Sequence, residues 1–240
     1  MRILITNDDG IRASQLPALV QWARTLGEVT VVAPEVEQSG KSQGINIHDP
    51  FSCKRVDLLP GVVAWSVDST PADCVRFAVL GKGMEFDLVI SGINRGLNIG
   101  SDILYSGTVA AIFEAQRLGI RAMALSTQPA CYDRSTEHLD SIWQFVCRHD
   151  LLSCGGPYNI NIPSAPKGIR ITRQGGPYYS DDFIPVGGDL YQAQGKPIFE
   201  PSGDPELDTD STLGGYITIT PLTLDRTNHA LFQSLRSLNV

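Results

Sequence analysis

Strand-like and helix-like segments alternate along the first two thirds of this 240-residue chain, and this alternation restricts its possible folds more than any other feature. Six short apolar runs have the pattern of buried strands, at residues 2–6, 29–33, 65–67, 87–91, 122–126 and 159–162. Segments with helical spacing of apolar residues lie between them, at about residues 16–27, 71–80, 108–118 and 139–146. Repeated strand–helix units predict a three-layer α/β/α sandwich with a mostly parallel, Rossmann-like sheet.

The pattern changes after Pro163. Residues 164–214 are rich in Gly, Pro and Asp, the strand-like runs at 169–172 and 216–220 are isolated, and a short helix is predicted near residues 231–235. We therefore expect a single domain over residues 1–240. Its α/β core covers about residues 1–163, and a C-terminal extension of the same sheet with protruding β-hairpins covers about residues 164–240.

The formal net charge is −7, from 19 basic and 26 acidic side chains. This balance argues against a protein that coats nucleic acid or an anionic membrane, because clustered Lys and Arg bind such surfaces. Neither a signal-peptide pattern nor a run of ~20 apolar residues is evident, and the five cysteines lack C-x-x-C spacing. We expect a cytoplasmic protein with reduced thiols, and we expect Cys74 and Cys147 to be buried because both fall at apolar helical positions.

Ligands of open parallel sheets bind at the carboxyl ends of the strands, so the loops after the predicted strands are candidate sites. The first of these loops, residues 7–10, reads N-D-D-G and lacks the G-x-G-x-x-G of a dinucleotide-binding turn. If Asp8 and Asp9 converge in a turn, their carboxylates repel each other unless a cation lies between them. An ordinary turn that caps the next helix has the same composition, and this segment does not separate the two interpretations.

The second loop ends in S-G-K-S at residues 39–42, like the end of a P-loop. Glu35 occupies the position of the first P-loop glycine, where a carboxylate would repel a triphosphate, and this disfavours a nucleoside triphosphatase. The hydroxyl of Ser39 or Ser42 is a candidate metal ligand, and a solvated turn is the alternative.

The third loop is rich in glycine and is expected to extend over residues 92–107. Asn94 and Asn98 offer neutral oxygen ligands or amide donors, and Arg95 is either a phosphate clamp or an ordinary surface residue. Ser106 and Thr108 stand at the start of a predicted helix, where free N–H groups favour an anion and a hydroxyl serves as N-cap. The two roles are compatible. A long irregular loop in a compact domain more often has a function than not.

Seven motifs lie in order along the chain, most densely before Pro163. They read T-N-D-D-G at residues 6–10, A-P-x-x-x-Q-S-G-x-S at 33–42, T-P-A-D-C-V at 70–75, S-G-I-N-x-G-x-N-x-G at 91–100, Y-S-G-T-V-A-A at 105–111, N-I-P at 161–163 and D-T-D…G-Y-I-T-I-T-P-L from 208 to 222. Together they make the chain resemble the SurE family of survival proteins, which are 5′/3′-nucleotidases.

The resemblance implies a metal-dependent phosphomonoesterase that hydrolyses nucleoside 5′- and 3′-monophosphates, and short polyphosphate as a further substrate. It assigns the metal ligands to Asp8, Asp9, Ser39 and Asn94. These all-oxygen ligands favour one Mg²⁺ or Mn²⁺ per subunit over Zn²⁺. The residues expected to contact the substrate or its phosphate are Asn7, Asn94, Gly96, Asn98, Ser106, Gly107 and Thr108. The C-terminal extension is expected to support a homodimer or homotetramer, and neither a nucleic-acid polymer nor a membrane is an expected partner.

The catalytic residues are expected to be Asp8, Asn98 and Ser106. Asp8 would orient or deprotonate the attacking water, while Asn98 and the amides of residues 106–108 would stabilise charge on the transferring phosphoryl group. Two alternatives remain at this point: an aspartyl-phosphate route with Asp8 as the nucleophile, and a non-catalytic nucleotide-sensing module. In either case the acidic composition is consistent with a phosphate ligand, because Asp8 and Asp9 would recruit the cation that binds it.

Overall fold

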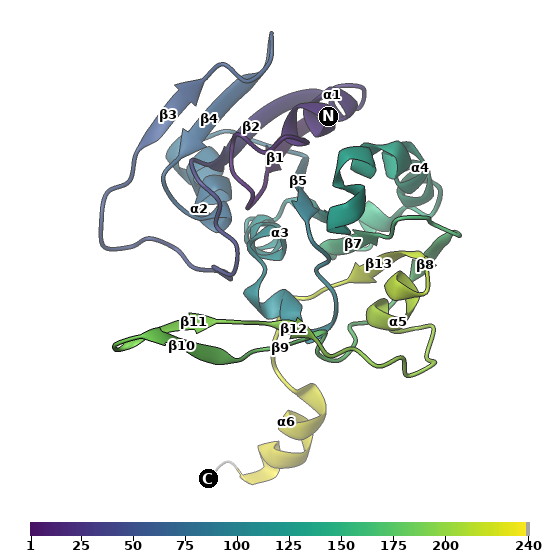
Figure 1. The fold of residues 1–240 in the computed structure, drawn as a ribbon. Helices are drawn as coiled ribbons and strands as arrows, with labels where there is room; N and C mark the ends of the chain where they lie inside the picture. The colour runs from purple at the N-terminus through teal and green to yellow at the C-terminus, as the bar shows by residue number, and fades with distance from the viewer. Residues whose placement is uncertain (239–240) are drawn as a thin grey trace.

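The computed structural model describes residues 1–238 and is organised around one nine-stranded sheet (Figure 1). The strand order is β3-β4-β2-β1-β5-β6-β7-β13-β8. Its strands are β1 (Arg2–Thr6), β2 (Glu28–Pro34), β3 (Cys53–Val56), β4 (Val63–Val67), β5 (Leu88–Arg95), β6 (Arg121–Thr127), β7 (Tyr158–Ile162), β8 (Ile169–Ile171) and β13 (Ile217–Pro221). All neighbouring pairs are parallel except β3 with β4 and β13 with β7.

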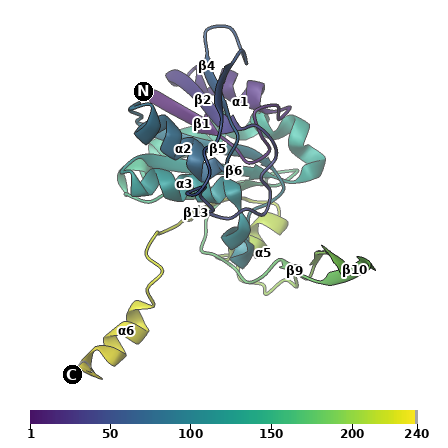
Figure 2. The same cartoon turned by 90° about the vertical axis from the view of Figure 1, so that its left-hand side faces the viewer.

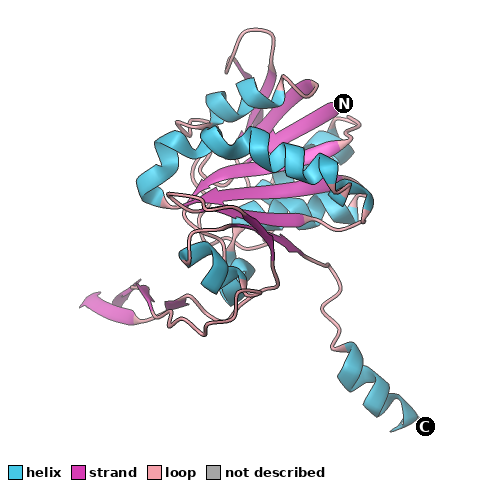
Figure 3. Cartoon of the chain, turned by 90° about the vertical axis from the view of Figure 1, so that its right-hand side faces the viewer, coloured by secondary structure: helices cyan, strands magenta, loops and turns pink. Residues whose placement is uncertain are grey.

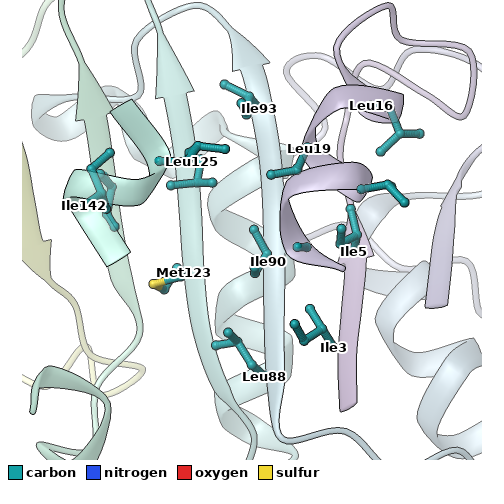
Figure 4. Close-up of a cluster of buried hydrophobic side chains, with 14 of the residues drawn as sticks. Ile3, Ile5, Leu16, Leu19, Leu88, Ile90, Ile93, Met123, Leu125 and Ile142 are labelled. Carbon is teal, nitrogen blue, oxygen red and sulfur yellow. The ribbon is translucent and has the colours of Figure 1, made fainter. Parts of the chain in front are cut away.

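Helices cover both faces of this sheet, which confirms the predicted three-layer α/β/α class (Figure 3). The helices α1 (Leu16–Ala23) and α4 (Leu139–Arg148) pack on one face, and α2 (Pro71–Arg76) and α3 (Gly107–Arg117) pack on the other. Figure 4 shows the core under α1 and α4, where isoleucines of β1 and β5 meet leucines of α1. Strand residues alternate between the two cores, as the two-residue period of a strand requires.

Local signals explain where the helices near the site begin. The Thr70 side chain accepts a hydrogen bond from the Asp73 amide at 3.2 Å, and Pro71 occupies the first turn of α2. The Ser106 hydroxyl accepts a 3.1 Å hydrogen bond from the Val109 amide and thereby caps α3. Four further helical segments of 3₁₀ or π type belong to the same body: η1 (Phe77–Gly81), η2 (Gly100–Tyr105), η3 (Pro129–His138) and η4 (Leu151–Ser153).

The C-terminal part contributes β8 and β13 to the sheet and then projects from the body. A ribbon is formed by β9 (Tyr179–Ser180) with β12 (Lys196–Pro197) and by β10 (Phe183–Gly187) with β11 (Leu190–Ala193). After the short helix α5 (Asp208–Leu213) and β13, the chain ends in α6 (His229–Leu235) and the turn η5 (Arg236–Leu238). Figure 2 shows the ribbon and α6 standing clear of the body in different directions. The predicted protruding hairpins are therefore confirmed.

Three local predictions were incomplete or wrong. The strand β3 was not predicted, because none of its four residues is fully buried and its sequence lacks an apolar pattern. The loop expected over residues 92–107 is partly regular, since β5 continues through a bulge to Arg95 and η2 follows. Cys74 is buried as expected, but Cys147 is exposed. It follows the buried Val146, and adjacent helical residues point about 100° apart.

A search of residues 1–238 for membrane-spanning segments found no helix with the length and apolarity to cross a bilayer.

Candidate functional site

The Asp8 carboxylate lies in the turn after β1, beneath the start of α3, and is only 4% exposed. Its Oδ1 accepts a 2.6 Å hydrogen bond from the Thr108 hydroxyl. Burial raises the pKa of Asp8 to about 6, and the neighbouring Asp9 acts in the same direction. The hydrogen bonds from Thr108 lower the pKa but do not cancel the effect of burial. A carboxylate in this environment is expensive to ionise unless a cation accompanies it.

Gly107 is what lets α3 approach Asp8 this closely. A Cβ at this position would lie 3.0 Å from the Asp8 Cβ and 3.2 Å from the Pro71 ring. Any side chain here would push the helix start away from the turn. The positive end of the α3 dipole is therefore directed at the Asp8 turn.

Asp9 lies beside Asp8 and is partly exposed. Its Oδ2 accepts a 3.2 Å hydrogen bond from the Arg95 amide and a longer, 3.5 Å contact from the Tyr132 hydroxyl. Partial burial raises the pKa of Asp9, and the charge of Glu37 adds to this effect. Burial and the charge of Asp9 raise the pKa of Tyr132 to about 12, so its hydroxyl keeps its proton. Sequence reasoning missed Tyr132, which reaches the site from η3, because no local motif marks it.

Hydrogen bonds from the backbone amides of Gln38 and Arg95 hold the loops that carry Ser39 and Asn94 against the turn of Asp8 and Asp9. The Gln38 backbone amide donates to the Asp8 carbonyl at 2.8 Å. Ser39 directly follows Gln38 in the sequence, so its loop lies against the turn that contains Asp8. The Ser39 hydroxyl is exposed and donates to Glu37 at 2.6 Å. Asn94 directly precedes Arg95, whose backbone amide donates to the Asp9 carboxylate. The Nδ2 of Asn94 donates to the Gly96 carbonyl at 2.9 Å. Within residues 1–238 the Asn94 Oδ1 has no donor and is available as a ligand.

The remaining predicted residues line the same edge of the sheet. Asn98 lies over the ends of β6 and β7, and its Nδ2 donates to the Ser126 hydroxyl at 2.8 Å. Ser126 is also the register partner of Asn94, so the two asparagines have a common neighbour. The Asn7 side chain forms two hydrogen bonds with the backbone of Gly10. Its Nδ2 donates to the Gly10 carbonyl and its Oδ1 accepts from the Gly10 amide, so both atoms stabilise the turn.

The donor atoms gathered here are suited to a hard divalent cation. They comprise two carboxylates, a hydroxyl and an amide oxygen, which Mg²⁺ and Mn²⁺ prefer over softer ligands. The part of the chain that the structure describes contains no cluster of three or more His, Cys, Asp or Glu side chains that could hold a metal. A cation here would therefore depend on the neutral oxygens of Ser39 and Asn94 in addition to Asp8 and Asp9. The burial of Asp8 beside a second carboxylate fits such a cation, which would offset their repulsion.

Comparison with known proteins gives consistent results. The family model described as "Survival protein SurE" matches residues 3–181. A protein of Gemmatimonas aurantiaca named 5′-nucleotidase SurE is 40% identical, and the match covers 95% of this chain and 94% of that protein. The Thermus thermophilus protein named 5′-nucleotidase SurE 1 is 38% identical, with 99% and 98% covered. The crystal structure of a SurE protein from Aquifex aeolicus superposes with a TM-score of 0.79 at 32% identity, with 99% of each chain covered.

Proposed function

The chain belongs to the survival protein SurE family, and from this membership we propose that it is a divalent-metal-dependent phosphomonoesterase acting on nucleoside 5′- and 3′-monophosphates. The products are the nucleoside and phosphate. The relatives named 5′-nucleotidase support the reaction class. The observation that carries the proposal is the buried Asp8 carboxylate, which lies beside Asp9 at the end of β1 and against the start of α3.

Four residues would hold the cation, namely Asp8, Asp9, Ser39 and Asn94, and Mg²⁺ or Mn²⁺ suits their oxygens. When bound, this cation supplies the positive charge that polarises the phosphoryl group and makes a nearby water more acidic. The backbone contacts from Gln38 to Asp8 and from Arg95 to Asp9 hold the loops that carry Ser39 and Asn94. The proposed site would therefore take its ligands from three loops at one sheet edge.

The carboxylate of Asp8 is the proposed base. Its Oδ1 is bonded to Thr108, so Oδ2 is the atom that would orient the attacking water and receive its proton. The Thr108 hydroxyl keeps the carboxylate in one orientation.

The start of α3 and the Asn98 side chain are the proposed phosphate-binding groups. The amide of Gly107 lies in the first turn of an eleven-residue helix, where N–H groups lack intrahelical partners. Ser106 caps this helix, so its position is fixed relative to those amides. Donors held in advance at the phosphoryl oxygens stabilise the charge of the transition state. Gly96, which lies between Asn94 and Asn98, allows a phosphate to approach the backbone.

We further propose a homodimer or homotetramer, supported by apolar side chains that the C-terminal part exposes. On α6 and the following turn, the exposed fractions of Leu231, Phe232, Leu235 and Leu238 lie between 47% and 69%. The β10–β11 hairpin exposes Phe183, Leu190 and Tyr191 to 66–67%. Exposed apolar patches of this kind are typical of surfaces covered by another subunit.

Small nucleotides in the cytoplasm are the proposed substrates, and the five unpaired cysteines agree with a reducing compartment. The proposal is tested by measuring phosphate release from a panel of nucleoside 5′- and 3′-monophosphates and short polyphosphate. Each substrate is assayed with Mg²⁺, Mn²⁺, Co²⁺ or Ca²⁺ and with EDTA. Turnover that requires a metal supports the proposal. Nucleotide binding without turnover under every condition would favour the sensing module instead.

A further inference from the structure

We propose that Asn161 is a positioning residue that fixes the backbone of Asn98 and so holds the side-chain amide of Asn98 in place for phosphate. This inference rests on the proposed function, because it takes Asn98 as a phosphate-binding group. It assigns a role to a residue that lies 63 positions away in sequence and on a different element.

The contacts between the two residues are reciprocal. The Asn98 amide donates to the Asn161 Oδ1 at 2.8 Å, and the Asn161 Nδ2 donates back to the Asn98 carbonyl at 2.8 Å. The Asn159 Nδ2 donates to the same carbonyl at 2.7 Å. The Asn161 side chain therefore bonds the backbone of Asn98 as a neighbouring strand would.

The Asn98 side chain is held separately from its backbone. Its Nδ2 donates to the buried Ser126 hydroxyl at 2.8 Å. Ser126 and Asn161 are register partners on the adjacent strands β6 and β7. Two neighbouring rigid strands therefore fix both the backbone and the side chain of one loop residue. Groups that must meet a transition state need this kind of support from rigid elements.

The alternation along β7 explains why two asparagines face this loop. Ile160 and Ile162 point into the core under α4, which turns Asn159 and Asn161 toward the opposite face. Both asparagines are 0% exposed. A buried amide is costly unless its polar atoms are bonded, and within the described chain the Asn159 Oδ1 has no partner. Two apolar side chains at positions 159 and 161 would avoid this cost. The asparagines are therefore better explained by their hydrogen bonds to the backbone of Asn98.

The segment at Asn98 needs such support because the last backbone bond to β6 before it is the one from the Gly96 amide to the Thr127 carbonyl, and residues 97–99 form no backbone bond to a strand within the described chain. Gly100 follows closely, with a φ of +61°, and marks the turn at which the chain leaves the sheet edge. Without the three side-chain bonds the backbone amide and carbonyl of Asn98 would be unpaired in a partly buried place, and Asn161 alone bonds the amide. A misplacement of about 1 Å at a catalytic group costs about a hundredfold in rate.

The test compares Asn161→Ala, Asn98→Ala and the double variant in steady-state phosphate release, with Thr218→Val as matched control. Thr218 is the register partner of Asn161, is equally buried and bonds to Thr212 rather than to Asn98. We expect Asn161→Ala to lower kcat by about a hundredfold without raising KM, and to have no further effect in the Asn98→Ala background. Thr218→Val should lose stability but keep kcat. Asn161→Leu keeps the approximate volume of the side chain without its polar atoms and should lower kcat as Asn161→Ala does, and it takes the place of the alanine variant if that protein does not fold.

Hydrogen–deuterium exchange of the segment around residue 98 gives a readout that does not depend on turnover. We expect Asn161→Ala to lose protection there, while Thr218→Val keeps it. A folded Asn161→Ala with wild-type kcat, an equal loss in the Asn98→Ala background, or unchanged protection overturns the inference. A wild-type protein that hydrolyses no phosphomonoester while Asn161→Ala still loses protection contradicts the proposed function and leaves the positioning contact standing.

Discussion

The Thr108 hydroxyl donates a 2.6 Å hydrogen bond to the Asp8 carboxylate across 100 positions of sequence. This bond joins the first loop of the sheet to the start of the helix that follows its fifth strand. The carboxylate proposed to act as base and the helix start proposed to bind phosphate are therefore fixed relative to each other.

Replacing Thr108 by valine removes the hydroxyl and keeps the branched shape. Because the hydrogen bond lowers the pKa of Asp8, its loss should raise that pKa further above its value of about 6. In the metal-free protein a smaller fraction of Asp8 is then ionised at a given pH, so the titration of the Asp8 carboxyl, followed by NMR in EDTA, should move to higher pH. Thr108→Ser keeps the donor and should keep the wild-type titration. An Asp8 titration that does not move in Thr108→Val would contradict the role assigned to this bond.

Asp8 should also govern how the stability of the metal-free protein depends on pH. The pKa of Asp8 in the folded protein lies above 3.8, the ordinary value of an aspartate, so the folded state binds the proton more tightly than the unfolded state. The free energy of unfolding should therefore fall as pH rises from about 4 to about 6, by about 3 kcal/mol from this group. Denaturation in EDTA at several pH values measures this slope. Asp8→Asn should flatten the slope and be the more stable protein above neutral pH, and an unchanged slope would refute the assignment.

Gly100→Ala should destabilise the protein much more than Gly119→Ala. Both glycines have positive φ, at +61° and +76°, so alanine costs each about 1–2 kcal/mol. A Cβ at 119 meets open space, whereas at 100 it overlaps the Gly176 carbonyl oxygen. This overlap should add about 1–3 kcal/mol to the loss for Gly100→Ala. Chemical denaturation of the two variants measures the difference, and equal losses would show that residues 100 and 176 are not in contact in solution.

The apolar face of α6 should be required for assembly. We expect the wild-type protein to have a mass in light scattering that is a multiple of 26.0 kDa. Glutamate at both Leu231 and Leu235 should place charge within the interface and shift the mass to that of the monomer. Gln233→Glu adds a charge to the same helix outside this pair and should leave the mass unchanged. A monomeric wild-type protein, or a double variant that still assembles, would rule out this role.

The sequence predicts the layers well because they depend on local patterns. Apolar periodicity identifies β1 and α4, and cap residues such as Thr70 and Ser106 mark helix starts. The four-residue strand β3 lacks such a pattern, because it lies at the edge of the sheet and has no fully buried residue. Only its pairing with β4 identifies it as a strand. The regular structure between residues 92 and 107 was missed because a bulge, rather than composition, lets β5 continue.

The sequence predicts which residues belong to the candidate site better than it predicts the contacts between them. Asp8, Asp9 and the glycine-rich segment are recognisable because loops at the ends of parallel strands converge. The Thr108 hydrogen bond to Asp8, the approach of Tyr132 to Asp9 and the Asn161 contact with Asn98 are not, because each joins residues at least 63 positions apart. Such contacts depend on strand order and register, which local sequence does not specify.

Phosphate release from AMP by the wild-type protein and by Asp8→Asn tests the proposed metal-dependent hydrolysis most directly. The wild-type protein should release phosphate with Mn²⁺ and stop in excess EDTA. Asp8→Asn should release none, bind Mn²⁺ more weakly and still give a cooperative unfolding transition. Full activity of Asp8→Asn, or of the wild-type protein in excess EDTA, would contradict both the metal dependence and the role of the buried carboxylate.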